Sequence, residues 1–261
     1  MPELRELMRP SPVVVASDTP LVVCAKRLLD HPSWRMLVAV DDDEVKGLVD
    51  DIAVFGNGVL LEEGLWFAFE PDGPDVAGTV ARPAPVVDAD TPVGVALRQL
   101  KGETGVVVVD GGAVAGLLTE HDLVAKAPAL LLGSRLVDET GSRPVITVPS
   151  STTARAALQR MGDHRVRHLV VVDDALKGVV SLRDVVAGWV SPEMPLTRVL
   201  SSDPRTVPLG TSLQSAATLM AEDDIGCLPV VDRDGDVVAI LTRSDIVEAV
   251  AAAADDEELF A

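Results

Sequence analysis

The stretch that decides the fold is HLVVVDDALKGVVSLRD, residues 168–184, in which two apolar runs flank an aspartate-rich segment. Short valine-rich runs bounded by Asp and Gly predict two β-strands joined by a turn. The final SLRD carries the chain from the second strand into a helix. Similar stretches occur at 36–53, 105–122 and 227–245. Three of the four copies end in Asp122, Asp184 and Asp245, which are 62 and 61 residues apart, so the chain contains a repeat of about 60 residues.

A second recurring element lies upstream of each copy and predicts one more strand and one more helix. It begins with a short β-branched run, continues with Asp-Thr-Pro, Ser-Thr-Thr or Gly-Thr-Ser, and ends in apolar residues at helical spacing. These triplets predict helix N-termini, with proline as the first helical residue in the first two copies. The elements occupy residues 11–29, 84–100, 143–161 and 204–220. Each unit therefore reads strand, helix, strand, strand, helix, which is a mixed α/β fold.

The repeats also predict the domain organisation. One such unit is too small to enclose a core, so we expect the units to pair. Repeats one and two predict an N-terminal module over residues 1–127, and repeats three and four a C-terminal module over 134–250. Residues 55–75 match no other repeat and predict an insertion packed on the first module. The end of the chain, residues 251–261, predicts an acidic tail.

Composition narrows the range of functions. The formal net charge is −19, from 41 acidic and 22 basic residues, which argues against direct contact with nucleic acid. Such an aspartate-rich, lysine-poor chain is typical of proteins from salt-loving organisms. Cys24 and Cys227 lack metal-ligand spacing and predict buried free thiols. Because no apolar stretch could span a membrane or serve as a signal peptide, we expect a cytoplasmic protein without membrane contact.

The repeat resembles the CBS domain, a family in which two repeats form a Bateman module and bind adenosine-containing ligands in the clefts between them. The resemblance rests on LVVVD (169–173) and LPVVD (228–232), each followed by a strand that leads into Ser/Thr-x-x-Asp. It implies an α/β (α+β) fold with four CBS repeats paired into two Bateman modules. The segment 166–173 is also similar to part of the gamma subunit of AMP-activated protein kinase, where a His-Arg pair contacts phosphate. Here the order is Arg167-His168.

The motif has a physical logic that suits a nucleotide. A glycine at a strand edge allows close approach of a ligand, a hydroxyl at a helix N-terminus suits a phosphate, and a carboxylate one turn later can accept hydrogen bonds from both ribose hydroxyls. The resemblance gives the aspartate this ribose role and places the Ser/Thr near the phosphate. A further threonine at the end of the first strand reaches the ligand. The residues that occupy these positions, with the Arg-His pair, are Thr119, Asp122, Thr147, Arg167, His168, Gly178, Ser181, Asp184, Thr206, Thr242 and Asp245.

The four repeats are not equally complete. Repeat one has Asp50 at the hydroxyl position and Ala53 at the ribose carboxylate, so we expect no ordinary nucleotide site there. Repeats one and two carry valine where repeats three and four carry Thr147 and Thr206. Repeat four has Ala239 in place of the glycine. The intact set of groups is therefore expected in the C-terminal module.

Several alternatives stay open. Ser/Thr-x-x-Asp is also the spacing of a helix capping box, in which Ser181 would cap a helix and Asp184 would reach back to its backbone. At the level of function, the sequence favours a regulatory protein that senses AMP, ADP or ATP and signals to an unknown protein partner, as a monomer or homodimer. The alternatives are a structural CBS protein with vestigial pockets and a sensor of S-adenosylmethionine. We find no catalytic constellation, no metal site and no required cofactor.

Overall fold

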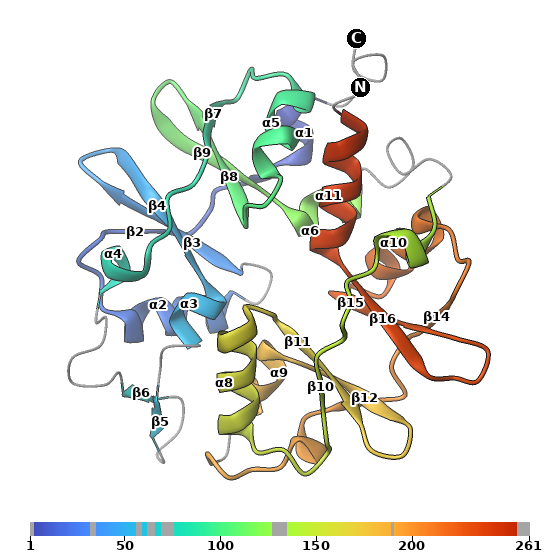
Figure 1. Cartoon of the computed structure of the whole chain (residues 1–261). Coiled ribbons are helices and arrows are strands. Elements are labelled where there is room, and N and C mark those ends of the chain that lie inside the picture. The colour runs from blue at the N-terminus through green and yellow to red at the C-terminus, as the bar shows by residue number, and fades with distance from the viewer. Residues whose placement is uncertain are drawn as a thin grey trace. The chain divides into compact units, whose positions relative to one another are not determined.

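The structure is a computed structural model that describes residues 3–31, 35–55, 59–61, 66–68, 76–126, 135–188 and 191–254. The four repeats succeed one another along the chain with the same order of elements (Figure 1). Repeat one consists of β2 (Val14–Val15), α2 (Leu21–Asp30), β3 (Met36–Asp41), β4 (Glu44–Asp50) and α3 (Asp51–Phe55). Repeat two consists of β7 (Val86–Asp88), α5 (Val93–Leu100), β8 (Gly105–Asp110), β9 (Ala113–Thr119) and α6 (Glu120–Lys126). Repeat three consists of β10 (Thr147–Val148), α8 (Ala154–His164), β11 (His168–Val172), β12 (Leu176–Ser181) and α9 (Leu182–Ala187). Repeat four consists of β14 (Val207–Pro208), α10 (Leu213–Glu222), β15 (Cys227–Val231), β16 (Val237–Thr242) and α11 (Arg243–Ala254). The predicted mixed α/β fold of four repeats is confirmed.

Strand pairing is the same in every repeat. The first strand runs parallel to the second, and the second and third form an antiparallel hairpin. Each hairpin has a register shift near the end of its first strand. In repeat three Thr147 lies beside Val170 and His168 lies opposite Ser181. The positions that the sequence aligned, such as Val14 and Val86, have the equivalent partners in their own sheets. The register therefore confirms the alignment of the repeats.

A short leading segment precedes each repeat and packs on a different repeat. The strand β1 (Arg9–Pro10) comes before repeat one but pairs with β9 of repeat two, and Arg82 comes before repeat two but bridges Leu48 of repeat one. In the same way Ser142 bridges Ile240 of repeat four, and β13 (Ser201–Ser202) pairs with β12 of repeat three. The segments also carry α1 (Leu4–Leu7), α4 (Ala77–Val80), α7 (Val137–Thr140) and the 3-10 helix η1 (Leu196–Arg198). Repeats one and two thus exchange their leading segments, and so do repeats three and four.

The chain forms two compact units, each with its own apolar core. One unit contains residues 1–12, 84–145 and 205–261, and the other contains residues 13–83 and 146–204. In the first unit α11 packs against α5 and α6 (Figure 1), with Leu97 and Leu213 among its buried core residues. In the second unit α3 packs against α8 and α9, around residues that include Leu158. Repeats two and four form the first unit, and repeats one and three form the second. The two repeats of each predicted module, 1–127 and 134–250, therefore belong to different units and exchange only their leading segments.

Helix N-termini follow the sequence in two repeats and differ in the other two. The side chains of Thr153 and Ser212 accept hydrogen bonds from the backbone of α8 and α10, as expected of N-cap residues. Pro20 and Pro92 are themselves the N-cap residues of α2 and α5, with extended backbone, and are not the first helical residues. The prediction for these two prolines was wrong by one position, because the helical conformation begins only after them.

The remaining predicted segments are described only in part. Within the predicted insertion 55–75, β5 (Val59–Leu61) and β6 (Trp66–Ala68) form an antiparallel hairpin, and most of the other residues lie outside the described ranges. Residues 127–134, between the two predicted modules, also lie outside them. The first four residues of the predicted tail 251–261 belong to α11, which ends at Ala254, and residues 255–261 lie outside the described ranges.

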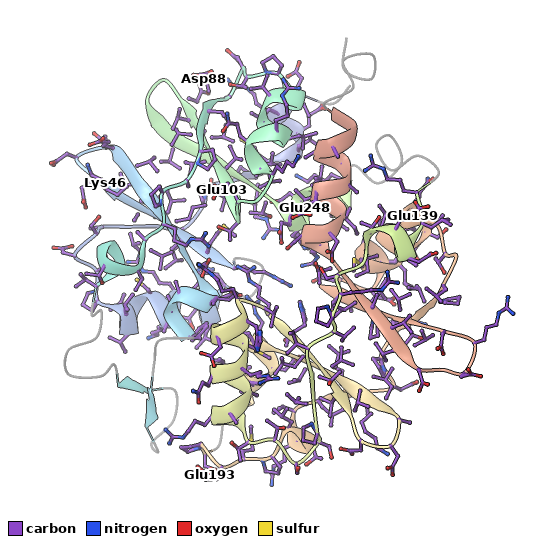
Figure 2. All side chains as sticks on the ribbon, in the orientation of Figure 1. Lys46, Asp88, Glu103, Glu139, Glu193 and Glu248 are labelled. Atoms are coloured by element: carbon purple, nitrogen blue, oxygen red, sulfur yellow. The ribbon has the colours of Figure 1, made fainter. Side chains whose placement is uncertain are left out.

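The prediction of two buried free cysteines is confirmed. Cys24 and Cys227 are both buried and free, and burial raises the pKa of the Cys24 thiol to about 11. Charged side chains such as Asp88 and Glu193 are exposed and point away from the sheets and helices (Figure 2). None of the helices in the described ranges is both long and apolar enough to cross a membrane.

Candidate ligand-binding site

In repeat three, the sheet brings three of the predicted residues to one end. His168 on β11 lies directly opposite Ser181 on β12. Thr147 on β10 lies beside Val170, two residues further along β11. Thr147 is exposed, whereas His168 and Ser181 are half-buried. The α9 helix begins directly after Ser181 and carries Asp184 in its first turn. A hydroxyl, an imidazole, a second hydroxyl and a carboxylate therefore lie near one end of this sheet.

The Ser181-x-x-Asp184 motif forms a helix capping box. Ser181 accepts a hydrogen bond from the Asp184 backbone N–H at 3.1 Å, and Asp184 Oδ2 accepts one from the Ser181 backbone N–H at 2.8 Å. Ser181 Oγ also donates to Asp184 Oδ2 at 2.6 Å. The structural interpretation of the motif is thus confirmed. The same bonds hold the Asp184 carboxylate in one orientation, which is what a binding role would also require.

Repeats two and four build the same box. Asp122 Oδ2 accepts from the backbone N–H and the Oγ1 of Thr119, at 3.1 and 2.6 Å. Asp245 Oδ2 accepts from the same two groups of Thr242, at 2.6 and 2.7 Å. One carboxylate oxygen is therefore committed to the cap in each of the three complete motifs. What differs between them is the second oxygen.

In repeats two and four, the second oxygen contacts a residue of the exchanged leading segment. Asp122 Oδ1 forms an ion pair with Arg9 at 3.2 Å, and Asp245 Oδ1 accepts a hydrogen bond from Ser142 Oγ at 2.6 Å. The residue of the leading segment at the equivalent position in repeat three is Ser201, which pairs with Val179 just as Ser142 bridges Ile240. No hydrogen bond joins Ser201 to Asp184, and Asp184 Oδ1 has no partner in the described part of the chain. Among the three motif aspartates, only Asp184 has a carboxylate oxygen that accepts no hydrogen bond from the described residues.

Burial divides the three aspartates in the same way. Asp122 is 2% exposed and Asp245 is 8% exposed, while Asp184 is only half-buried. A carboxylate that is both enclosed and already hydrogen-bonded has little capacity left for an incoming donor. A half-exposed carboxylate that is oriented on one side and open on the other retains that capacity. Repeat three therefore contains the most complete candidate site.

Repeat one is organised around a buried acidic pair. Asp50 Oδ1 accepts a hydrogen bond from the Ala53 backbone N–H at 2.7 Å, so it caps α3 in place of a hydroxyl. Asp51 accepts a hydrogen bond from Arg167 Nε of repeat three at 2.8 Å, and Asp50 lies 3.8 Å from another Arg167 nitrogen. Both carboxylates therefore lie within ion-pair distance of the Arg167 guanidinium. This cation, predicted as a phosphate contact, is thus paired with carboxylates of its own compact unit; its contact with a ligand stays a prediction.

The motif glycine has a clear packing role. A Cβ atom at Gly178 would overlap the Leu200 side chain and the Ser201 carbonyl oxygen, so Gly178 permits the close approach of β13. In repeat four, where Ala239 replaces this glycine, a glycine stands on the opposing segment instead. A Cβ built on Gly141 would lie 3.2 Å from the Ala239 Cβ. The close approach that the sequence assigned to a ligand is made by the exchanged segment, and contact of Gly178 with a ligand stays a prediction.

A charged cluster at the N-termini of α6 and α11 was not anticipated. Arg243 is 4% exposed and donates from one nitrogen to Asp224 at 3.0 Å, whereas its Nε and Nη1 have no acceptor among the described residues. His121 Nδ1 lies 3.5 Å from the same Asp224 carboxylate. Burial, and then the nearby Arg243 and Arg9, lower the pKa of His121, and burial lowers the pKa of Arg243. No sequence signal marks this cluster, because its members come from two different repeats.

The remaining predicted residue, Thr206, lies exposed just before β14 at the position equivalent to Thr147. An open groove of about 500 Å³ is lined by residues that follow Thr206 in the chain: Val207, Pro208, Thr211, Gln214, Ser215, Thr218, Leu219 and Glu222. The groove does not include Thr242 or Asp245.

Within the described residues, no group of three His, Cys, Asp or Glu side chains is placed to hold a metal ion.

Comparison with known sequences identifies the family. The chain matches the CBS domain four times, over residues 4–55, 76–128, 137–191 and 190–252. These matches cover most of the chain, which therefore belongs to the CBS domain family. Each match begins at or before a leading segment, so the exchanged segment and the repeat that follows it form one CBS unit of sequence.

Individual relatives agree with this assignment. A solved structure from Methanocaldococcus jannaschii, proposed as an archaeal homologue of the gamma subunit of AMP-activated protein kinase, has a TM-score of 0.78 at 18% identity and covers 95% of this chain and 99% of its own. A conserved protein from Pyrococcus horikoshii has a TM-score of 0.66 at 20% identity, with 94% and 98% coverage. At these identities the likeness shows the fold alone. Another Methanocaldococcus jannaschii protein is 26% identical over 95% of this chain, which spans 62% of that relative.

Proposed function

We propose that this protein is a regulatory sensor that binds an adenosine-containing ligand, AMP, ADP or ATP, with Asp184 of repeat three as the ribose-binding carboxylate. The observation that carries the proposal is the state of that carboxylate. Its Oδ2 is fixed by Ser181, and its Oδ1 has no partner in the described residues. A ribose has two adjacent hydroxyl groups that can donate hydrogen bonds. The half-exposed Asp184 carboxylate, held in one orientation, can accept them.

The neighbouring groups are suited to the rest of a nucleotide. Thr147 is exposed on the adjacent strand, and His168 lies opposite Ser181. A hydroxyl and an imidazole can both donate hydrogen bonds to a phosphate or to the base. The Ser181 hydroxyl already donates to Asp184, so it would contact a phosphate only by giving up that bond. We therefore assign Ser181 chiefly to positioning Asp184.

We further propose that binding is read out by a change of geometry and not by catalysis. A ligand shifts a conformational equilibrium only if it binds two arrangements unequally. The unknown protein partner, the cytoplasmic location and the monomeric or homodimeric state are part of this proposal. The second candidate function, a structural CBS protein with vestigial pockets, is favoured for repeats two and four by one observation: both Asp122 and Asp245 are already satisfied inside the protein.

The test is thermal unfolding and calorimetry with AMP, ADP, ATP, adenosine and S-adenosylmethionine. A ligand at about 100 times its Kd should add roughly 2.7 kcal/mol to the free energy of unfolding. Asp184→Asn keeps an oxygen for the cap but removes the charge, and should weaken binding at least about tenfold, since a hydrogen bond to a charged group contributes about 1.5–3 kcal/mol.

Asp122→Asn is the matched control, because it changes the same motif in a repeat whose carboxylate is occupied by Arg9. Its affinity for the ligand should equal that of the wild-type protein. Absence of stabilisation with every adenosine compound would leave the structural function as the better account. A preference for S-adenosylmethionine over the nucleotides would change the ligand but keep the site.

A further inference from the structure

The leading segments place one residue in the same position against each of the four sheets. Arg9, Arg82, Ser142 and Ser201 lie beside Leu117, Leu48, Ile240 and Val179, which are equivalent residues of the third strand of each repeat. Three of these four side chains approach an acidic motif residue of the repeat on which they pack. Ser201 is the exception.

Ser142 occupies the second oxygen of Asp245. Its hydroxyl donates to Asp245 Oδ1 at 2.6 Å, while Thr242 supplies two donors to Oδ2. The backbone holds the serine in place, because the Ser142 N–H donates to the Ile240 carbonyl at 2.8 Å and the Ile240 N–H donates back at 3.3 Å. A ribose hydroxyl would need the same oxygen and would offer the same kind of donor. Ser142 competes with it from within the chain, at no cost in lost translational freedom.

We propose that Ser142 is a specificity-determining residue that closes the fourth-repeat motif by donating its own hydroxyl to Asp245 in place of a ribose. Arg9 closes the second-repeat motif in the same manner with a charge. The inference rests on the proposed function and goes further, because it states which of three complete motifs binds ligand and why. The wild-type protein accordingly binds one adenosine ligand, at repeat three.

Residue type alone does not distinguish the closed motif of repeat four from the open motif of repeat three. Ser142 and Ser201 are both serines at equivalent positions, yet only Ser142 bonds to its aspartate. The two therefore form a matched pair for mutation. Ser142→Ala removes the competing hydroxyl and opens a second site, whereas Ser201→Ala removes a hydroxyl that closes nothing. Ser142→Thr keeps the hydroxyl and leaves the site closed.

Isothermal titration calorimetry with AMP tests this by stoichiometry. We expect one site in wild-type protein, Ser201→Ala and Ser142→Thr, and two sites in Ser142→Ala. The double variant Ser142→Ala/Asp184→Asn isolates the fourth repeat. It should bind one AMP, and a third change, Asp245→Asn, should weaken that binding at least about tenfold.

The outcomes separate the two proposals. One site in both wild-type protein and Ser142→Ala, lost in Asp184→Asn, upholds the proposed function and overturns the closure by Ser142. No site in wild-type protein and one in Ser142→Ala overturns the site at repeat three but supports the closure. No site in either, or a wild-type site that Asp245→Asn removes, overturns the closure. If circular dichroism shows that Ser142→Ala does not fold, Ser142→Cys, nearly isosteric and a weak donor, replaces it with the same expected stoichiometry.

Discussion

At the scale of single residues, Asp122, Asp184 and Asp245 have the same motif and the same capping geometry but different surroundings. Arg9 and Ser142 occupy the second oxygen of two of them, and the third remains open to the solvent side of its repeat. A hydrogen-bonding group is useful for recognition only to the extent that the protein has not already satisfied it. The chemical identity of a motif residue is therefore a weaker guide to binding than the partners of each of its atoms.

Arg243 illustrates the opposite situation, a buried cation with too few partners. Its Nε and Nη1 find no acceptor in the described residues, and its ion-pair partner there, Asp224, has a side chain that is 76% exposed. Buried donors without acceptors cost about 1–3 kcal/mol each, and an exposed partner contributes at most about 1 kcal/mol. We predict that Arg243→Met raises the free energy of unfolding by about 1 kcal/mol, measured by urea denaturation.

The control for this prediction is Arg205→Met, which removes an ion pair between Arg205 and Asp223 that is largely exposed on the arginine side. Its effect on the free energy of unfolding should be small. Clear destabilisation by Arg243→Met alone would contradict the prediction. It would mean that the buried guanidinium is satisfied by a group outside the described residues.

At the scale of elements, the exchange of leading segments determines both packing and chemistry. Each segment adds a strand or a bridge to the sheet of a different repeat. In three of the four repeats it also delivers a side chain that contacts an acidic motif residue. The close approach is made possible by a small residue on one side or the other: Gly178 in repeat three and Gly141 opposite Ala239 in repeat four. The glycine of the motif is thus a packing requirement of the exchanged segment.

This leads to a prediction for Gly178→Ala. The added methyl group would overlap the side chain of Leu200 and the backbone of Ser201, so β13 must move. Overpacking of this kind costs about 1–3 kcal/mol, which should appear as a lower midpoint in urea or thermal unfolding. The reverse change at the equivalent position, Ala239→Gly, removes a methyl group that fits, and should cost only about 0.5–1 kcal/mol. Equal, small effects of both variants would show that β13 adapts without strain.

At the scale of the whole molecule, charge is the dominant feature. A net charge of −19 over 261 residues generates self-repulsion in the compact state. Raising KCl from about 0.1 M to about 1 M shortens the Debye length from about 10 Å to about 3 Å. We predict that the Tm rises by several degrees over this range, since about 1 kcal/mol corresponds to roughly 2–4 °C for a chain of this size.

The matched variant, Asp42→Asn/Asp43→Asn, carries two fewer charges in the exposed β3–β4 turn and should show a smaller rise. A Tm that does not respond to KCl would mean that the charges are spaced widely enough not to interact.

Much of this architecture could be predicted from the sequence because its signals are local. Valine-rich runs, turn residues and N-cap triplets each act within a few residues, so the order of strands and helices in all four repeats was predictable. The equivalence of Thr147 with Val14 and of Ser181 with Asp50 was predictable for the same reason, since a repeat carries its own register. The missing carboxylate at Ala53 also needed no structure to be seen.

The tertiary structure decided everything that depends on contacts between distant segments. It placed each leading segment on another repeat, satisfied Asp122 and Asp245 from within the chain, paired Arg167 with Asp51, and left Asp184 open. These outcomes depend on distances between groups that lie up to 116 residues apart in the chain. A local pattern specifies which chemical group a position carries, but the free capacity of that group is set by whatever the fold brings against it.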